Sequence, residues 1–253
     1  MKDIVRQISV VVSILATIIV NGLANALPIN GLNTGEISDR FKVYFVPAGY
    51  VFSIWGLIYL GLIAFTIFQA LPAQRANPRM RATGWWVVLS GLANITWILL
   101  WHYEIFPLTI LVMLILLVSL IVVYLRLGIG RTKVSNAETW WVRVPFSIYL
   151  GWITVATVAN ATSLLDYLKW NAFGIAPETW MVIILAAVLA ISTLMSITRR
   201  DLAYTLVILW ALAGIGLKHA ATAAVATPTW ITFGLVALAL VLASIFKRNT
   251  KRS

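Results

Sequence analysis

The sequence predicts an all-α polytopic membrane protein, a bundle of about eight transmembrane helices. The chain of 253 residues is 61% hydrophobic and only 11% charged, with a mean hydropathy of +0.94, which is far from the balance of a soluble domain. Its apolar runs are continuous and about 20 residues long, the length that crosses a bilayer as a helix. A transmembrane β-barrel would show short alternating segments instead.

The apolar runs follow one another along the chain, separated by Pro, Gly and charged residues that end helices. We expect membrane spans at residues 7–27, 48–70, 85–103, 107–127, 144–166, 179–198, 202–218 and 228–246. The sixth and seventh are joined by a tight turn. No polar stretch is long enough to fold separately, so the chain forms a single membrane domain.

The basic residues support this count of spans. If the N-terminus is cytoplasmic and every run crosses once, 15 of the 19 Lys and Arg residues fall on the cytoplasmic side, and the exceptions are Arg40, Lys42, Lys169 and Lys218. This is the bias that the positive-inside rule describes. We therefore predict an integral, multi-pass membrane protein with both termini cytoplasmic. The topology also explains the net charge of +11 without any nucleic-acid partner.

Amide and aromatic side chains recur at helical spacing inside four of the spans. They are Asn21 and Asn25 in the first, Phe52, Trp55 and Tyr59 in the second, Asn94, Trp97 and Trp101 in the third, and Tyr149, Trp152 and Asn160 in the fifth. Residues three or four apart share a helix face, so each set forms a stripe. We expect the stripes to converge in the outer half of the membrane, beneath the loop 28–46, whose Gly, Asn and Thr content suits a flexible lid. The two asparagines also favour retention of the first span, which otherwise resembles a cleavable signal sequence.

Aromatic walls with a few amide groups suit a large, flat, mostly apolar ligand. A purely structural interpretation stands beside this one. Asn94 and Asn160 would then only bond neighbouring helices, and Trp55, Trp97 and Trp152 would pack in the interior without touching a ligand. The tryptophans near span ends are typical of the headgroup belt.

These stripes resemble the TspO/translocator protein family, also known as tryptophan-rich sensory proteins or peripheral benzodiazepine receptors. The resemblance rests on one motif in each of three spans: Pro47, Trp55 and Tyr59 in the second, Asn94 and Trp97 in the third, and Tyr149, Trp152 and Asn160 in the fifth. It covers residues 1–166, which we interpret as a five-helix TspO-like core. Residues 167–253 then add three transmembrane helices and a basic cytoplasmic tail. The chain departs from the family pattern in having one proline of a pair and Ile148 where the family has proline.

The resemblance implies an integral membrane protein that binds porphyrins, haem, sterol-like or other apolar ligands in an outward-facing cavity capped by the first loop. No cofactor is required, and a bound porphyrin or haem is the group that the resemblance suggests. The residues that it places on or behind this cavity are Asn25, Pro47, Trp55, Tyr59, Asn94, Trp97, Tyr149, Trp152 and Asn160. Such a protein would act as a sensor, carrier or regulator.

Two other functions stay open. The first is a facilitative transporter that is not coupled to protons. All eight acidic residues fall in loops or at span ends, whereas proton-coupled transporters carry acidic residues at mid-membrane. A porphyrin-degrading enzyme is the other, although we predict no catalytic or metal-ligating residues. Cysteine is absent, and His102 and His219 lack carboxylates at a metal-ligand spacing, so we expect both to be interfacial.

The three additional spans carry few polar groups, and we interpret them as packing helices. They either enlarge the bundle or replace a dimer interface, so a monomer and a homodimer are both compatible with the sequence. The expected partners are membrane lipid and a small apolar ligand.

Overall fold

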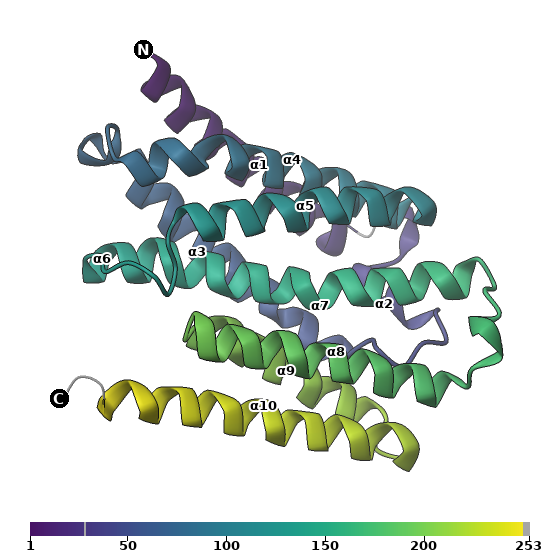
Figure 1. The fold of residues 1–253 in the computed structure, drawn as a ribbon. Coiled ribbons are helices and arrows are strands. Elements are labelled where there is room, and N and C mark those ends of the chain that lie inside the picture. Colours follow the sequence, from purple (N-terminus) through teal and green to yellow (C-terminus); the bar gives the residue numbers. More distant parts are fainter. Residues whose placement is uncertain (28, 250–253) are drawn as a thin grey trace.

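The computed structural model describes residues 1–27 and 29–249 and is almost wholly helical (Figure 1). Eight long helices make up the bundle: α1 (Lys2–Ala26), α3 (Ile54–Ala70), α4 (Pro78–His102), α5 (Phe106–Arg126), α7 (Val144–Tyr167), α8 (Pro177–Thr198), α9 (Leu202–Lys218) and α10 (Ala223–Asn249). Short segments connect them: η1 (Ile29–Gly31), α2 (Thr34–Asp39), η2 (Gly49–Ser53), η3 (Pro72–Gln74), α6 (Asn136–Glu138), the π-helical turn η4 (Thr139–Arg143) and η5 (Ala172–Gly174). The predicted polytopic helical membrane bundle is confirmed.

Helix α9 is shorter than the other long helices. Within the described residues, seven helical segments are long and apolar enough to cross a membrane, and α9, at 17 residues, falls below that length. At ~1.5 Å rise per residue it spans roughly 26 Å, slightly less than a typical hydrocarbon core of ~30 Å. The expectation of eight spans therefore corresponds to seven full-length helices and one short apolar helix.

Local sequence explains where the helices start. The Asn77 side chain accepts a hydrogen bond from the Arg79 N–H at 2.9 Å, and Pro78 occupies the first helical position of α4. The Asp201 carboxylate accepts from the Tyr204 N–H at 3.1 Å and so caps α9. Both arrangements satisfy backbone donors that a helix N-terminus leaves without a partner.

The first five long helices form a closed ring. Helix α1 packs against α3 and α4, α4 against α5, α5 against α7, and α7 against α3. The last three helices form a second layer, in which α9 packs on α7 and η2, and α10 packs on α8 and α9 (Figure 1). The ring is formed by the five helices of residues 1–167 and the layer by the three that follow, and the division into a TspO-like core and an addition stays a prediction.

The long helices alternate in direction, so the start of α1 and the end of α10 lie at the same end of the bundle (Figure 1). The α3–α4, α5–α7 and α8–α9 connections lie at this end too, and they carry Arg75, Arg131, Arg143, Arg199 and Arg200. We call it the basic end, and we call the opposite end, where α2 lies, the loop end. The cytoplasmic location of the basic end stays a prediction.

Helix α9 approaches the start of the α3 region very closely at Gly214. A Cβ atom on Gly214 would lie 2.1 Å from Val51 Cγ2 and 3.3 Å from Pro47 Cβ. The Trp210 indole N–H donates to the Val51 carbonyl at 3.1 Å. The additional layer therefore supports η2, the segment that leads into α3.

We expect Gly214→Val to lower the free energy of unfolding by at least ~1–3 kcal/mol, because forced overpacking has that cost. Thermal unfolding of the detergent-solubilised protein measures the effect. Gly234→Val is the matched control, since a Cβ at Gly234 in α10 meets nothing within 4 Å. Equal melting temperatures for the two variants would contradict close packing of α9 on η2.

Candidate functional site

A cavity of about 500 Å³ opens between α1 and α3 at the loop end of the bundle. Helix α1 contributes amides, η2 and α3 contribute aromatic rings, and the first loop covers the top. The lining residues are Asn21, Gly22, Asn25, Asn33, Thr34, Gly35, Glu36, Asp39, Gly49, Phe52, Trp55, Tyr59 and Ile98. The volume lies within the usual range for sites that bind drug-sized molecules, roughly 300–1,000 Å³.

One wall of the cavity is built from stacked aromatic rings. The rings of Trp55 and Tyr59 stack with centroids 5.5 Å apart and an interplanar angle of 24°. Their spacing of four residues places both on one face of α3. Behind them, the Trp152 ring contacts Trp55 and Phe52 edge-on, at centroid distances of 6.4 and 5.6 Å. The wall therefore presents an aromatic surface that a second, rigid layer holds in place.

A chain of buried hydrogen bonds runs from the lining residue Asn21 across three helices. The Asn21 side-chain N–H donates to Asn94 Oδ1 at 2.7 Å, and Asn94 Nδ2 donates to the Tyr149 hydroxyl at 2.8 Å. All three residues are at most 2% exposed. The relay joins α1, α4 and α7, and it satisfies polar groups that would otherwise be stranded in an apolar interior.

A second relay lies beside the first, and none of its three residues lines the covered cavity. The Trp97 indole N–H donates to Asn160 Oδ1 at 3.3 Å, and Asn160 Nδ2 donates to Thr109 Oγ1 at 2.8 Å. It joins α4, α7 and α5. The tryptophan and asparagine that lie on matching stripes in the sequence thus meet as a pair between helices.

The stripes therefore converge, but only some of their residues face the cavity. Of the residues predicted to form the site, Asn25, Trp55 and Tyr59 line it. The others stand behind its walls or further along the helices, where they bond or pack against neighbours: Pro47, Asn94, Trp97, Tyr149, Trp152 and Asn160. A direct role of these six residues in ligand binding stays a prediction.

Several lining residues are absent from the predicted set. Asn21 and Phe52 belong to the same stripes as Asn25 and Trp55, so periodicity alone could have found them. Gly22 and Gly49 line the cavity because they lack a side chain, and no pattern in the sequence marks them.

The cover over the cavity is an ordered helical turn. Asn33 caps α2 by accepting from the Gly35 and Glu36 N–H groups, each at 3.0 Å, and the Glu36 carboxylate accepts from the Asn33 N–H at 2.7 Å. This reciprocal capping box stabilises a short helix. The Thr34 N–H also donates to Asn25 Oδ1 at 3.3 Å. Asn33 of this loop therefore serves as a helix cap, and Thr34 and Gly35 form the first turn of α2, where the sequence suggested a flexible lid.

His102 anchors the cover, and its position at the membrane interface stays a prediction. Its side chain is fully buried, with Nδ1 3.1 Å from the Ile29 carbonyl oxygen and Nε2 3.1 Å from Thr34 Oγ1. Because a carbonyl oxygen can only accept, Nδ1 carries the proton and Nε2 accepts from the threonine hydroxyl. The ring thus fastens both η1 and α2 to the end of α4.

Three further polar contacts hold the edges of the first loop. Arg40 forms an ion pair with Glu104, in the turn after α4. On the other side, Asp39 pairs with Lys218 of α9 at 2.7 Å, and the Tyr44 hydroxyl donates to Glu178 of α8 at 2.8 Å. The additional layer therefore holds one edge of the cover, while the ring holds the other.

Because the Arg40–Glu104 ion pair holds the first loop, we expect this loop to be held less firmly in acid. The hydrogen-bonded Arg40 guanidinium lowers the pKa of the Glu104 carboxyl below its ordinary value. A carboxyl group whose pKa is lowered in the folded state stabilises that state at pH values above its ordinary pKa. This stabilisation is lost as the pH falls through the lowered pKa. We expect proteolytic cleavage within residues 40–46 to accelerate below about pH 4, near the ordinary pKa of glutamate.

The protease should cleave the Glu104→Gln variant faster than the wild type at neutral pH, because the ion pair with Arg40 is already lost. For the same reason, cleavage of the variant should accelerate less than that of the wild type when the pH is lowered. Glu36→Gln is the control, since Glu36 forms no ion pair among the described residues. Identical pH profiles for the wild type and Glu104→Gln would count against this contact.

The fold and the cavity together define a class of protein: a multi-pass helical membrane protein with a covered, amide- and aromatic-lined pocket at one end. A family model described as TSPO-like protein matches residues 7–245. The chain belongs to the TSPO-like protein family. The matched region includes α8 to α10 up to residue 245, so the additional layer lies within the family pattern. Comparison with curated proteins and with solved structures gave no match.

Proposed function

We propose that the protein binds a large, mostly apolar ligand, porphyrin- or sterol-like, in the cavity at the loop end, and acts as a sensor, carrier or regulator. The observation that carries the proposal is the cavity itself: about 500 Å³ with the stacked Trp55 and Tyr59 rings on one side and Asn21 and Asn25 on the other. Rings offer stacking surface to a flat ligand, and a few amides orient it.

The charge of the cavity favours a ligand without carboxylates. Among the described residues that line it, none is Lys or Arg, and Glu36 and Asp39 lie at its mouth. An anionic group would therefore enter without a counter-ion and lose its hydration. A neutral sterol-like molecule or an esterified porphyrin suits the walls better than a porphyrin dicarboxylate.

Within the described residues, the cavity offers no histidine to the iron of a bound haem. Axial ligation of haem iron usually requires a histidine, cysteine, methionine or tyrosine side chain. No histidine is among the described lining residues, and both ring nitrogens of His102 already have partners in the cover. Stacking on the aromatic rings thus supports tetrapyrrole binding. No described lining residue supports ligation of the iron by histidine.

Binding is better supported than passage through the bundle. The Asn21–Asn94–Tyr149 relay joins α1, α4 and α7 beside the cavity. Further toward the basic end, α1 and α3 are joined by the Gln7 amide, which donates to the Gln69 carbonyl at 2.6 Å. A facilitative transporter would have to break both contacts, whereas a sensor or carrier needs only the cover to open.

Titration of the purified protein with a porphyrin dicarboxylate, its dimethyl ester and a neutral sterol tests the proposal. Binding should be saturable, with the ester binding more tightly than the acid. Gly22→Phe should abolish it, because Gly22 lines the cavity and a Cβ there meets nothing within 4 Å. The control is Gly56→Phe, at an exposed glycine of α3 with the same open surroundings that does not line the cavity. Equal loss in both variants, or no saturable binding of any of the three ligands, would refute it.

A further inference from the structure

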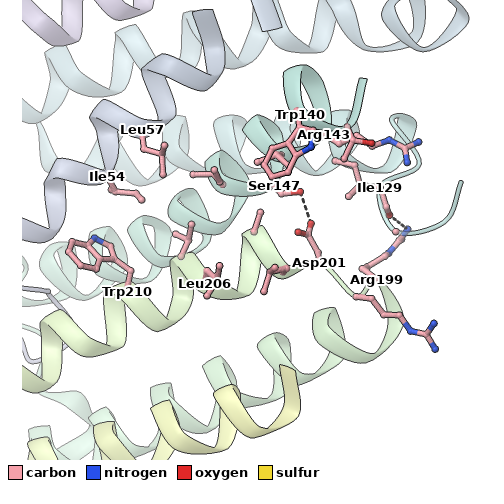
Figure 2. A pocket seen from close by; sticks show the side chains of 18 residues that line it. Ile54, Leu57, Ile129, Trp140, Arg143, Ser147, Arg199, Asp201, Leu206 and Trp210 are labelled. Carbon is pink, nitrogen blue, oxygen red and sulfur yellow. Dashed lines mark hydrogen bonds between the residues drawn. The ribbon is translucent and has the colours of Figure 1, made fainter. Parts of the chain in front are cut away.

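A second hollow, of about 620 Å³, lies between α3, α7 and α9 and reaches the basic end of the bundle. We call it the basic-end groove. It is separate from the covered cavity, because the two share no lining residue. Figure 2 shows Leu57, Leu206 and Trp210 toward one end of the groove, Arg143 and Arg199 toward the other, and the Ser147–Asp201 hydrogen bond between them.

The apolar part of the groove opens sideways, toward the lipid that surrounds the bundle. Leu57 and Leu206 are 50% and 51% exposed, and Trp210 is 39% exposed. They belong to α3 and α9, two of the helices that line the groove. From Leu202 at the start of α9 to Trp210 the wall is about 12 Å long, at ~1.5 Å per residue. A wall of this length lets part of an acyl chain lie along it.

The other end of the groove carries arginines that lack acidic partners. Arg143, Arg199 and Arg200 line it, and none of them forms an ion pair within the described part of the chain. Among the described residues, Arg199 contacts neutral groups, the Ile129 carbonyl at 3.5 Å and the face of the Tyr124 ring at 5.8 Å. Arg200 is exposed.

Arg143 gives a second, independent indication of an anion. Its side chain is buried, at 7% residue exposure, and it donates to the Leu127 carbonyl at 2.8 Å and to Thr132. Its Nε is buried and has no hydrogen-bond partner within residues 1–27 and 29–249. Glu138 attracts this guanidinium but is already paired with Arg79. Because a buried guanidinium without a paired counter-ion is costly, a nearby anion would be stabilising.

One carboxylate also lies in the groove, and it already accepts hydrogen bonds from neighbouring groups of the protein. Asp201 is the single acid among the described lining residues. It accepts from the Ser147 hydroxyl at 2.6 Å and from the Tyr204 N–H at 3.1 Å. It therefore serves as the cap of α9 and balances one arginine, which leaves the groove with two positive charges in excess.

We propose that the basic-end groove binds one anionic phospholipid. The headgroup phosphate lies against Arg199 and Arg200, with Arg143 contributing positive charge, and one acyl chain follows the wall formed by Leu57, Leu206 and Trp210. Arginine matches phosphate geometry with paired N–H donors. The groove has its charge at the end of the bundle and its apolar wall toward the membrane centre. A phospholipid has its headgroup and acyl chains in the same order. The bound lipid would bridge the ring and the additional layer.

Native mass spectrometry of the delipidated protein, titrated with phosphatidylglycerol or with phosphatidylcholine of identical acyl chains, tests the proposal. One phosphatidylglycerol should bind in preference to phosphatidylcholine. Arg199→Gln and Arg200→Gln should each reduce that preference about fivefold, the effect of one basic residue near an anionic lipid surface. Arg131→Gln is the matched control, because Arg131 is exposed at the same end and does not line the groove.

Leu206→Trp is a second variant that fills the apolar wall and leaves the arginines intact. It should release the lipid, whereas inorganic phosphate at millimolar concentration should not displace it. Equal binding of the two lipids, equal loss in Arg131→Gln, or displacement by phosphate alone would overturn the proposal. A dimer that Leu206→Trp dissociates would also overturn it, because a second copy of the chain would then occupy the groove.

Discussion

Trp55→Ala is expected to weaken binding of the ester porphyrin by about ten- to a hundredfold. The Trp55 ring lines the covered cavity and stacks on Tyr59. Removing a large buried apolar side chain forfeits ~1.5–3 kcal/mol of contact, and a factor of ten in affinity corresponds to ~1.4 kcal/mol. The same titration that tests the proposed function measures the change.

Trp97→Ala separates a lining role from a supporting one. Trp97 carries the same side chain on a similar stripe, but it does not line the cavity and its indole N–H bonds Asn160. We expect this variant to lower the melting temperature while ligand affinity, measured below that temperature, changes much less than in Trp55→Ala. A larger loss of affinity in Trp97→Ala would show that the ligand lies deeper, between α4 and α7.

Asn94→Leu is expected to produce the largest loss of stability among the cavity residues. Asn94 is fully buried and lies at the centre of the Asn21–Asn94–Tyr149 relay. Replacing it leaves a donor of Asn21 and the hydroxyl of Tyr149 without their shared partner. Each unsatisfied buried group costs ~1–3 kcal/mol, although hydrogen bonds measured inside membranes average nearer ~0.6 kcal/mol. We therefore expect a loss of about 2–4 kcal/mol and a melting temperature lower by several degrees.

Thr96→Leu is the matched control for this variant. Thr96 lies on the same helix, is exposed toward the surroundings of the bundle, and bonds only the Leu92 carbonyl of its own helix. It should be nearly neutral. In the double variant Asn94→Leu with Tyr149→Phe the orphaned hydroxyl is gone, so its loss should be smaller than the sum of the single losses. Additive losses would mean that the two side chains are not coupled as the relay requires.

Much of the architecture is local information and could be predicted from the sequence. Hydrophobic length locates the long helices, because each must satisfy its backbone within the apolar layer. The predicted run 202–218 coincides with α9, and the run 107–127 differs from α5 by one residue at each end. Larger differences occur where polar residues extend a helix beyond the membrane, as in α4, which begins at Pro78 instead of residue 85.

The stripes of amides and indoles were equally visible, because residues three or four apart share a helix face whatever surrounds it. Periodicity predicts that such a face turns inward. It does not predict whether that face meets a void or another side chain. Trp55 and Trp97 have the same pattern around them, yet only the first borders the cavity.

The sequence by itself determined the membrane-spanning helices, the clustering of basic residues at one end, and the existence of a polar, aromatic interior. Only the tertiary structure decided which side chains face the cavity, that His102 fastens the cover, and that α9 supports η2 and borders a second groove. The physical reason is that helix formation depends on short-range periodicity and apolar length. The position of a void depends on how neighbouring helices rotate and how closely they approach, which residues far apart in the chain determine together.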